Sequence, residues 1–423
     1  MLASLQDILD TVKANNLTYH QKLMTLGNIA ERLFDPRDLL GYTDEEWGFL
    51  QNQMICDLCE GYAIYRPRYI LPDYNVYIQK GCEFLELPPP KDLDEALDEL
   101  LILYSHVPSI TTYPVYVGRF DVLLEPFITD EEKDYIKIKR FLNHIDKTVP
   151  DSFCHANIGP YDTKAGRLIL RAVIELEAPT QNMTIRYDKS KTSREFAELA
   201  AKACLLVSKP SFANDAYYIS DLGEEYGVAS CYNALPECGG AYTLTRLRLG
   251  TIARACKSAD EMLNELLPRV AKCALSTMDK RHKFVVEESN FFNSSFLEKE
   301  GFIKRTNFTG MFAIVGLADA TNHLLQCEGL NETFGKSVRG DEIATAIMDK
   351  LKEITDAHEG VYAERTGNRY LLHAQVGASN HEEDKRNAPA HRIRVGEEPT
   401  LLAHLKQSAP FHKYFPSGTG DFL

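Results

Sequence analysis

Residues 311–317 form an uninterrupted apolar run, Met-Phe-Ala-Ile-Val-Gly-Leu, without a charged side chain. A strand exposed on one face alternates apolar and polar residues, whereas a strand covered on both faces is apolar throughout. The run therefore predicts a strand inside a sheet that is covered on both sides. Further strand-like segments occur at residues 115–117, 242–249 and 370–377, and residues 168–170 are compatible with either a strand or a helix.

Segments with helical spacing separate these strands. Asp92, Thr192 and Ser258 each precede a glutamate by three residues and are followed by apolar residues at helical spacing, which is a helix-start signal. A helix without a breaker is expected from about residue 341 to 354, and residues 1–50 have the spacing of several helices. Strands that alternate with longer helices indicate an α/β sheet or barrel.

The length of 423 residues suits two average domains or one large α/β barrel. The absence of a long linker favours a helical N-terminal region, residues 1–50, followed by one continuous catalytic domain, residues 51–423. Hydrophobic residues make up 44% and the net charge is −14. This charge argues against broad contact with nucleic-acid phosphates, but a small anionic substrate in a local basic pocket stays compatible with it.

No stretch approaches about 18 uncharged apolar residues, and the N-terminus has no basic segment followed by a long apolar one. The sequence therefore predicts a cytoplasmic protein without a membrane span. The ten cysteines are then expected to be reduced thiols, several of them small buried side chains in amphipathic helices.

Cys231 lies in a segment, residues 226–240, that ends in a turn formed by Pro236, Gly239 and Gly240. Because a strand-like run follows, the thiol is expected on a short loop, where chemistry rather than packing decides its role. A nucleophile, a metal ligand, a radical carrier and a packed thiol remain alternatives. The Cys-x-x-Cys pair at residues 56–59 has no second pair, so no metal site is expected.

Several other polar residues have unusual settings. Each is compatible with a capped turn or a satisfied core group. Together with Cys231 they indicate a buried polar pocket lined by strand ends. They are His155 and Asn157 beside a Gly-Pro turn, Asn214 after a Lys-Pro turn, His373 and Gln375 two residues apart on a strand, and Arg66 and Arg68 among aromatic residues.

Residues 228–236, Val-Ala-Ser-Cys-Tyr-Asn-Ala-Leu-Pro, resemble the cysteine loop of glycyl radical enzymes, specifically of the YjjI type. The resemblance extends from about residue 50 to the C-terminus. A weaker similarity to anaerobic ribonucleotide reductases occurs at residues 243–246 and 314–317. Further matching blocks are Cys56-Asp57, residues 65–74, 155–160, 209–214, 293–301 and 373–375.

The resemblance implies a ten-stranded α/β barrel, made of two five-stranded half-sheets around a loop with Cys231 at its tip and surrounded by helices. It also implies a radical mechanism. An activating radical S-adenosylmethionine (SAM) enzyme generates a glycyl radical, which converts Cys231 to a thiyl radical that abstracts hydrogen from a small polar substrate. A closed barrel would protect these radicals from quenching.

The resemblance also suggests roles for individual residues. Cys238, Cys56 or Cys59 is a candidate partner thiol. Glu237 is a candidate base, because Asn233 stands where eliminating relatives carry glutamate. The expected substrate-binding residues are His155, Asn157, Asn214, Asn233, His373, Gln375, Arg66 and Arg68. Substrate and reaction type stay open among carbon–carbon cleavage, elimination and reduction.

The sequence differs from glycyl radical enzymes in the segment that carries the glycyl radical. Glycyl radical enzymes carry an Arg-Val-x-Gly-Tyr-like segment near the C-terminus, and the nearest string here, residues 394–398, lacks its spacing and tyrosine. We therefore expect the glycyl domain to be absent from this sequence. Either the chain has been shortened before that domain, or a small partner protein supplies the glycyl radical in trans, which is the alternative we favour. The expected partners are that protein and the radical-SAM activase, with no permanently bound cofactor or metal; a homodimer is compatible.

Two other functions stay open at this stage. One is a degenerate barrel without catalysis that serves as a binding or scaffold protein. The other is an ordinary cysteine hydrolase, for which a base near Cys231 would be needed.

Overall fold

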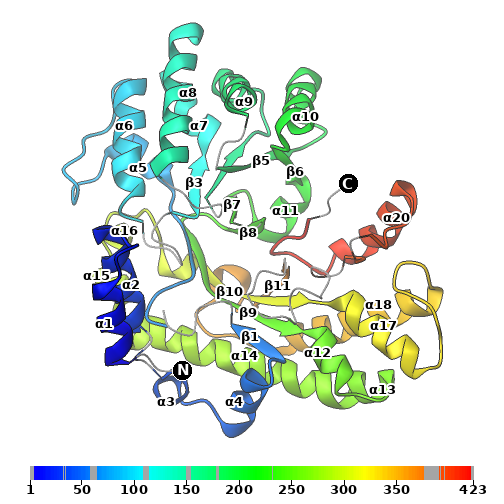
Figure 1. The fold of residues 1–423 in the computed structure, drawn as a ribbon. Coiled ribbons are helices and arrows are strands. Elements are labelled where there is room, and N and C mark those ends of the chain that lie inside the picture. Colours follow the sequence, from blue (N-terminus) through cyan, green and yellow to red (C-terminus); the bar gives the residue numbers. More distant parts are fainter. Residues whose placement is uncertain are drawn as a thin grey trace.

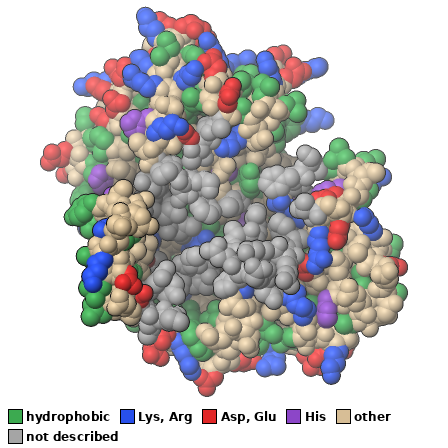
Figure 2. Space-filling view, viewed as in Figure 1, with side chains coloured by type: hydrophobic (Ala, Val, Ile, Leu, Met, Phe, Trp, Pro, Cys, Tyr) green, Lys and Arg blue, Asp and Glu red, His purple; other side chains and the backbone are tan. Residues whose placement is uncertain are grey.

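The computed structural model describes residues 4–31, 33, 35–57, 64–107, 114–148, 154–177, 181–230, 232–375, 390, 392–394 and 396–420. Two half-sheets face each other, and a short hairpin lies between them (Figure 1). Helices surround both half-sheets on the outside. Figure 2 shows one face of the molecule, on which the positively and negatively charged side chains of the described residues are interspersed without a broad patch of one sign.

The first half-sheet contains five strands in the described residues. β9, β10 and β11 run parallel to one another, whereas β1 and β2 pair antiparallel with the same edge of β9. The strands are β1 (Ile55–Asp57), β2 (Tyr69–Leu71), β9 (Gly239–Arg248), β10 (Phe308–Val315) and β11 (Leu371–Ala374).

The second half-sheet contains four described strands, all parallel, in the order β3-β4-β5-β6. The hairpin is a separate two-stranded antiparallel sheet of β7 and β8. These strands are β3 (Tyr116–Arg119), β4 (His155–Ile158), β5 (Asn182–Tyr187), β6 (Ser211–Asn214), β7 (Tyr226–Ala229) and β8 (Asn233–Pro236).

The helices form the outer layer. In Figure 1, α8, α9 and α10 lie outside the second half-sheet, and α14 and α12 lie below the first. None of the helices in the described parts of the chain combines the length and apolarity needed to cross a bilayer. The described α-helices of five or more residues are α1 (Leu5–Lys13), α2 (Tyr19–Glu31), α3 (Pro36–Leu40), α4 (Asp44–Gln51), α5 (Tyr74–Lys80), α6 (Leu93–Tyr104), α7 (Phe120–Leu124), α8 (Glu131–Thr148), α9 (Lys164–Leu176), α10 (Arg194–Val207), α11 (Asp215–Leu222), α12 (Leu249–Arg254), α14 (Leu267–Lys283), α17 (Leu317–Cys327), α18 (Val338–Ala357) and α20 (Leu401–His412).

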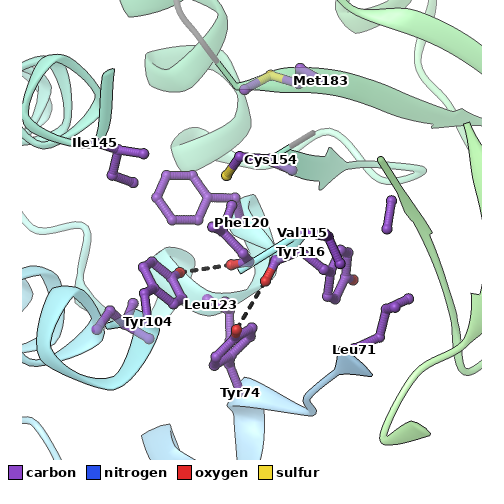
Figure 3. Close-up of a cluster of buried hydrophobic side chains, with 14 of the residues drawn as sticks. Leu71, Tyr74, Tyr104, Val115, Tyr116, Phe120, Leu123, Ile145, Cys154 and Met183 are labelled. Carbon is purple, nitrogen blue, oxygen red and sulfur yellow. Dashed lines mark hydrogen bonds between the residues drawn. The ribbon is translucent and has the colours of Figure 1, made fainter. Parts of the chain in front are cut away.

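The core beside the second half-sheet includes tyrosines whose hydroxyl groups reach strand backbone. Tyr104 donates to the Val117 carbonyl at 2.7 Å, and Tyr74 donates to the Tyr116 carbonyl at 2.9 Å (Figure 3). Buried hydroxyl groups need such partners, because leaving them unpaired costs about 1–3 kcal/mol. The two tyrosines therefore anchor α5 and α6 to β3.

The predicted α/β class is confirmed. Residues 311–315 of the apolar run lie in the buried strand β10, whereas Gly316 caps α17, which begins at Leu317. Asp92 and Ser258 cap helices as predicted, but Ser193, not Thr192, caps α10. The ambiguous residues 168–170 are helical. Four helices lie within residues 5–51, and the division into residues 1–50 and 51–423 stays a prediction.

Candidate active site

Both strands of the hairpin, β7 and β8, are buried at every residue. Ala229 pairs with Asn233, so the chain reverses direction between these two residues, in a turn that includes Ser230 and Tyr232. Cys231, the predicted catalytic residue, lies outside the described residues. Its two neighbours nevertheless define where this turn sits, between the half-sheets.

Both neighbours of residue 231 have left-handed backbone conformations. The φ angle is 53° at Ser230 and 65° at Tyr232. For residues other than glycine such conformations cost about 1–3 kcal/mol each and persist only where the surroundings enforce them. The turn is therefore held by its contacts rather than by its own preference.

Asn157 on β4 binds the hairpin backbone with both ends of its amide. Its Oδ1 accepts from the Val228 backbone N–H at 2.8 Å, and its Nδ2 donates to the Val228 carbonyl at 2.9 Å. The side chain thus pairs with β7 as a neighbouring strand would. The sequence predicts Asn157 as a substrate ligand, but the structure uses it to hold the hairpin.

His155, two residues earlier on β4, holds the turn itself. Its Nδ1 donates to the Ser230 carbonyl at 2.9 Å, and its Nε2 accepts from the Thr184 hydroxyl at 2.7 Å. Burial lowers the pKa of His155 to about 4, so the ring is neutral near pH 7. Both ring nitrogens are therefore occupied, and His155 positions Ser230; its role in substrate binding stays a prediction.

Residues 417–418 hold the other side of the hairpin. The Ser417 carbonyl accepts both the Ala234 backbone N–H at 3.0 Å and His373 Nδ1 at 3.0 Å. Gly418 has φ 104°, and a Cβ atom there would lie 2.3 Å from the Tyr232 carbonyl oxygen. Only glycine fits this approach. These residues therefore link β11 to β8.

A row of side chains crosses the first half-sheet on one face. Cys56, Arg246, Ala313 and His373 occupy paired positions on β1, β9, β10 and β11, so they share that face. Arg246 Nη2 lies 2.9 Å and Arg248 Nη2 lies 3.3 Å from Cys56 Sγ. The sequence analysis missed both arginines, although charged residues two apart in an apolar strand were an available signal.

Arg66 and Arg68, both predicted to bind substrate, have different surroundings. Arg68 is buried, stacks 5.1 Å from the Tyr69 ring and lies near enough to His373 to contribute to lowering that imidazole's pKa. Arg66 is only partly buried and lies beside Tyr65. Gln375 is buried next to the His373 ring. Arg68 and Gln375 therefore lie near His373.

Glu237 and Cys238 lie at the base of the hairpin, away from its turn. Glu237 accepts from the Tyr116 hydroxyl at 3.0 Å and contacts Arg119 Nε at 3.3 Å. At about 3.3 Å per extended residue, the four residues from Asn233 to Glu237 span roughly 13 Å. The structure therefore separates both residues from the turn and does not support Glu237 as a base that reaches residue 231, or Cys238 as its partner thiol.

Asn214 is also not among the residues that contact the hairpin turn. Its side chain is exposed and caps α11 by accepting from the Tyr217 backbone N–H at 3.2 Å. With Tyr187 and Phe212 it lines an open cavity of about 330 Å³ at the ends of β5 and β6. Its role as a substrate ligand is not supported by this position.

Replacing Glu237 with glutamine is expected to change how stability depends on pH. Burial raises the pKa of Glu237 from its ordinary 4.5 to about 7. Between these values the folded protein keeps a proton that the unfolded chain has lost, so this residue makes stability fall as pH rises. Urea unfolding of both proteins should show the wild type losing about 3 kcal/mol relative to Glu237→Gln between pH 4.5 and 7. A pH-independent difference would contradict this.

The comparison with protein families matches residues 17–423 to the model described as glycyl radical enzyme YjjI-like. A relative in Haemophilus influenzae is 99% identical over all 423 residues, which cover 82% of its length. The protein YjjI of Escherichia coli is 41% identical over 378 residues, covering 88% of this chain and 72% of YjjI.

Solved structures show the same fold at low sequence identity. The anaerobic ribonucleotide reductase of Thermotoga maritima with glycerol in its active site aligns with a TM-score of 0.74 and 12% identity, covering 98% of this chain and 80% of that one. The hydroxyproline dehydratase of Clostridioides difficile aligns with a TM-score of 0.57 and 12% identity, covering 88% and 70%. From these matches we conclude that the chain belongs to the YjjI-like family of glycyl radical enzymes.

Proposed function

We propose that the protein abstracts a hydrogen atom from a small polar substrate through Cys231. The glycyl radical is supplied by a glycyl radical domain, after a radical-SAM enzyme has activated that domain. Membership of the glycyl radical enzyme family supports this proposal. The main structural support is that hydrogen bonds from both sides hold the turn around residue 231.

The hydrogen bonds hold the hairpin in a fixed position between the two half-sheets. His155 and Asn157 bind the hairpin on the side of the second half-sheet, and Ser417 binds it on the side of the first. Transfer of a hydrogen atom requires the two reacting atoms to be held near contact, which a mobile loop does poorly. Burial of the hairpin also excludes water from reactive intermediates.

The proposed step moves one hydrogen atom and one unpaired electron. The Cys231 thiyl forms an S–H bond while the substrate C–H bond breaks, leaving a carbon radical on the substrate. After that radical has rearranged to the product radical, the S–H hydrogen returns to it and restores the thiyl. Neither an external oxidant nor a reductant is consumed in an isomerisation or elimination of this kind.

The face that carries His373 is the proposed substrate side. Burial lowers the pKa of His373 to about 4, so its ring is neutral. Its Nδ1 donates to a carbonyl, which leaves Nε2 as an acceptor. Cys56 is the proposed second thiol, because guanidinium groups of Arg246 and Arg248 donate to its sulfur.

The test is anaerobic reconstitution with a radical-SAM activase and a glycyl-domain protein. Activated protein is mixed with diols, sugars, amino acids and nucleotides, and radicals and products are followed by electron paramagnetic resonance (EPR) and mass spectrometry. We expect a substrate radical or product that disappears in Cys231→Ala. Cys204→Ala, on the surface helix α10, is the matched control and should behave as wild type.

The source of the glycyl radical is tested in the same assay. The longer Haemophilus influenzae relative is activated without added glycyl-domain protein, in parallel with the 423-residue chain. Supply in trans predicts that both need the added protein. Activation of the relative alone would place the glycine in its own polypeptide, and a lack of any Cys231-dependent product would remove the catalytic proposal.

A further inference from the structure

Two polar side chains beside residue 231 have no hydrogen-bond partner among the described residues. They are Asn233, through both Oδ1 and Nδ2, and Ser230, through Oγ. Asn233 is 0% exposed and Ser230 is 1% exposed. Buried polar atoms are nearly always paired, because an unpaired one loses its bond to water without replacement. Both therefore lie where a ligand would complete them.

Asn157 on β4, which lies against the same hairpin, is by contrast fully paired. Both ends of its amide are bound to Val228, at 2.8 and 2.9 Å. The unpaired atoms lie at the turn itself, on the two residues that flank the segment 231–232. The same turn has the left-handed conformations at Ser230 and Tyr232. Strain and unpaired polar atoms at one place are typical of a functional site.

The unpaired atoms restrict the chemistry of the ligand. An amide needs one partner that donates and one that accepts, whichever way it is oriented. Carboxylates and phosphates only accept at neutral pH, and ammonium groups only donate. A hydroxyl group does both. The neighbouring imidazoles do not favour an anion either, because burial keeps His155 and His373 neutral near pH 7.

We propose that Ser230 and Asn233 form a subsite for a neutral hydroxyl group of the substrate, as found in polyols and sugars. The identification of that ligand as substrate rests on the proposed function. The binding itself does not, because it needs no radical. The subsite would hold the hydroxyl-bearing carbon of the substrate between Ser230 and Asn233, the described residues on either side of the segment 231–232.

Binding is tested by isothermal titration with three three-carbon probes: glycerol, malonate and 1,3-diaminopropane. Ribose is a larger neutral probe. We expect the wild type to bind glycerol or ribose and neither charged probe. Ser230→Ala and Asn233→Leu should each weaken binding about 10–100-fold. Asn264→Ala, which changes an exposed asparagine, is the matched control and should bind as wild type.

Thermal unfolding without ligand provides a second readout. Because Asn233→Leu removes two unpaired buried atoms, its melting temperature should rise by about 1–3 °C while binding is lost. A variant damaged only structurally would show a lower melting temperature. Ser230→Ala gives an independent check if the leucine does not fit.

Three results would overturn the subsite. These are malonate binding that depends on Asn233, equal glycerol or ribose binding in wild type and both variants, and no binding of any neutral probe. Failure of the proposed function looks different. In that case the neutral probes bind and depend on Asn233, but no Cys231-dependent radical or product forms after activation.

Discussion

Replacing Asp215 with alanine is expected to lower the free energy of unfolding by about 3–5 kcal/mol. Asp215 is fully buried and accepts from Arg186 Nε at 2.8 Å and from the Tyr226 hydroxyl at 2.9 Å. Without the carboxylate, the buried Arg186 keeps its charge and loses its anionic partner. The cost is large because water cannot reach the guanidinium group.

The loss of stability in Asp215→Ala should be greatest at the base of the hairpin. Arg186 also donates to the Tyr226 carbonyl at 3.4 Å and stacks 4.0 Å from the Tyr226 ring, so it joins β5 to β7. Urea unfolding measures the total effect, and hydrogen exchange at β7 measures the local one. Glu198→Ala removes an exposed ion pair on α10 and should stay close to wild type. Equal effects of the two variants would contradict the account.

Replacing His282 with glutamine is expected to remove part of the acid sensitivity of the fold. Burial lowers the pKa of His282 from its ordinary 6.5 to about 3. Its Nδ1 donates to the Val361 carbonyl at 3.3 Å, and its Nε2 accepts from the Thr243 hydroxyl at 3.0 Å. The ring lies 4.6 Å from Tyr242, which fixes it between α14 and β9.

The sign follows from the protons bound in each state. Above pH 6.5 both states are neutral at this residue. Below it the unfolded chain takes up a proton that the folded protein does not, so stability falls as pH decreases. The nearby charges are Asp279, which raises the pKa of His282, and Arg281 and His358, which lower it.

The measurement is urea unfolding from pH 7.5 to pH 4. At pH 7.5 the wild type should be the more stable protein, because glutamine does not replace the packing of the ring. Its advantage should shrink by about 3 kcal/mol between pH 6.5 and 4. His20→Gln, at an exposed position on α2, should leave the profile unchanged. An advantage that is constant with pH would show that His282 does not titrate below its ordinary range.

Local physical rules predicted much of the fold. The apolar run at β10 and the caps at Asp92 and Ser258 depend on neighbouring residues, so they can be recognised in the chain alone. The short strands β4, β6, β7 and β8 could not be predicted in this way. Each has four residues, and its pairing is set by distant segments of the chain.

The sequence predicted which residues lie at the candidate site better than it predicted what each of them does there. His155 and Asn157 do lie beside the hairpin, but a sequence does not show that their polar atoms bind its backbone. Glu237 is only six residues from Cys231 in sequence, yet the extended strand β8 separates it from the turn. Arg246 and Arg248 meet Cys56 only because β1 pairs with β9 in that register.

The central claim, that Cys231 exchanges a hydrogen atom with a glycyl radical, is tested without knowledge of the substrate. The reconstituted protein is activated anaerobically in H₂O and in D₂O, and the glycyl radical is followed by EPR. A thiol exchanges its hydrogen with water, so transfer through Cys231 should replace the remaining α-hydrogen of the glycine with deuterium. The account predicts that the hyperfine doublet collapses in D₂O with wild type and persists with Cys231→Ala. A doublet that persists in both, or collapses in both, would contradict it.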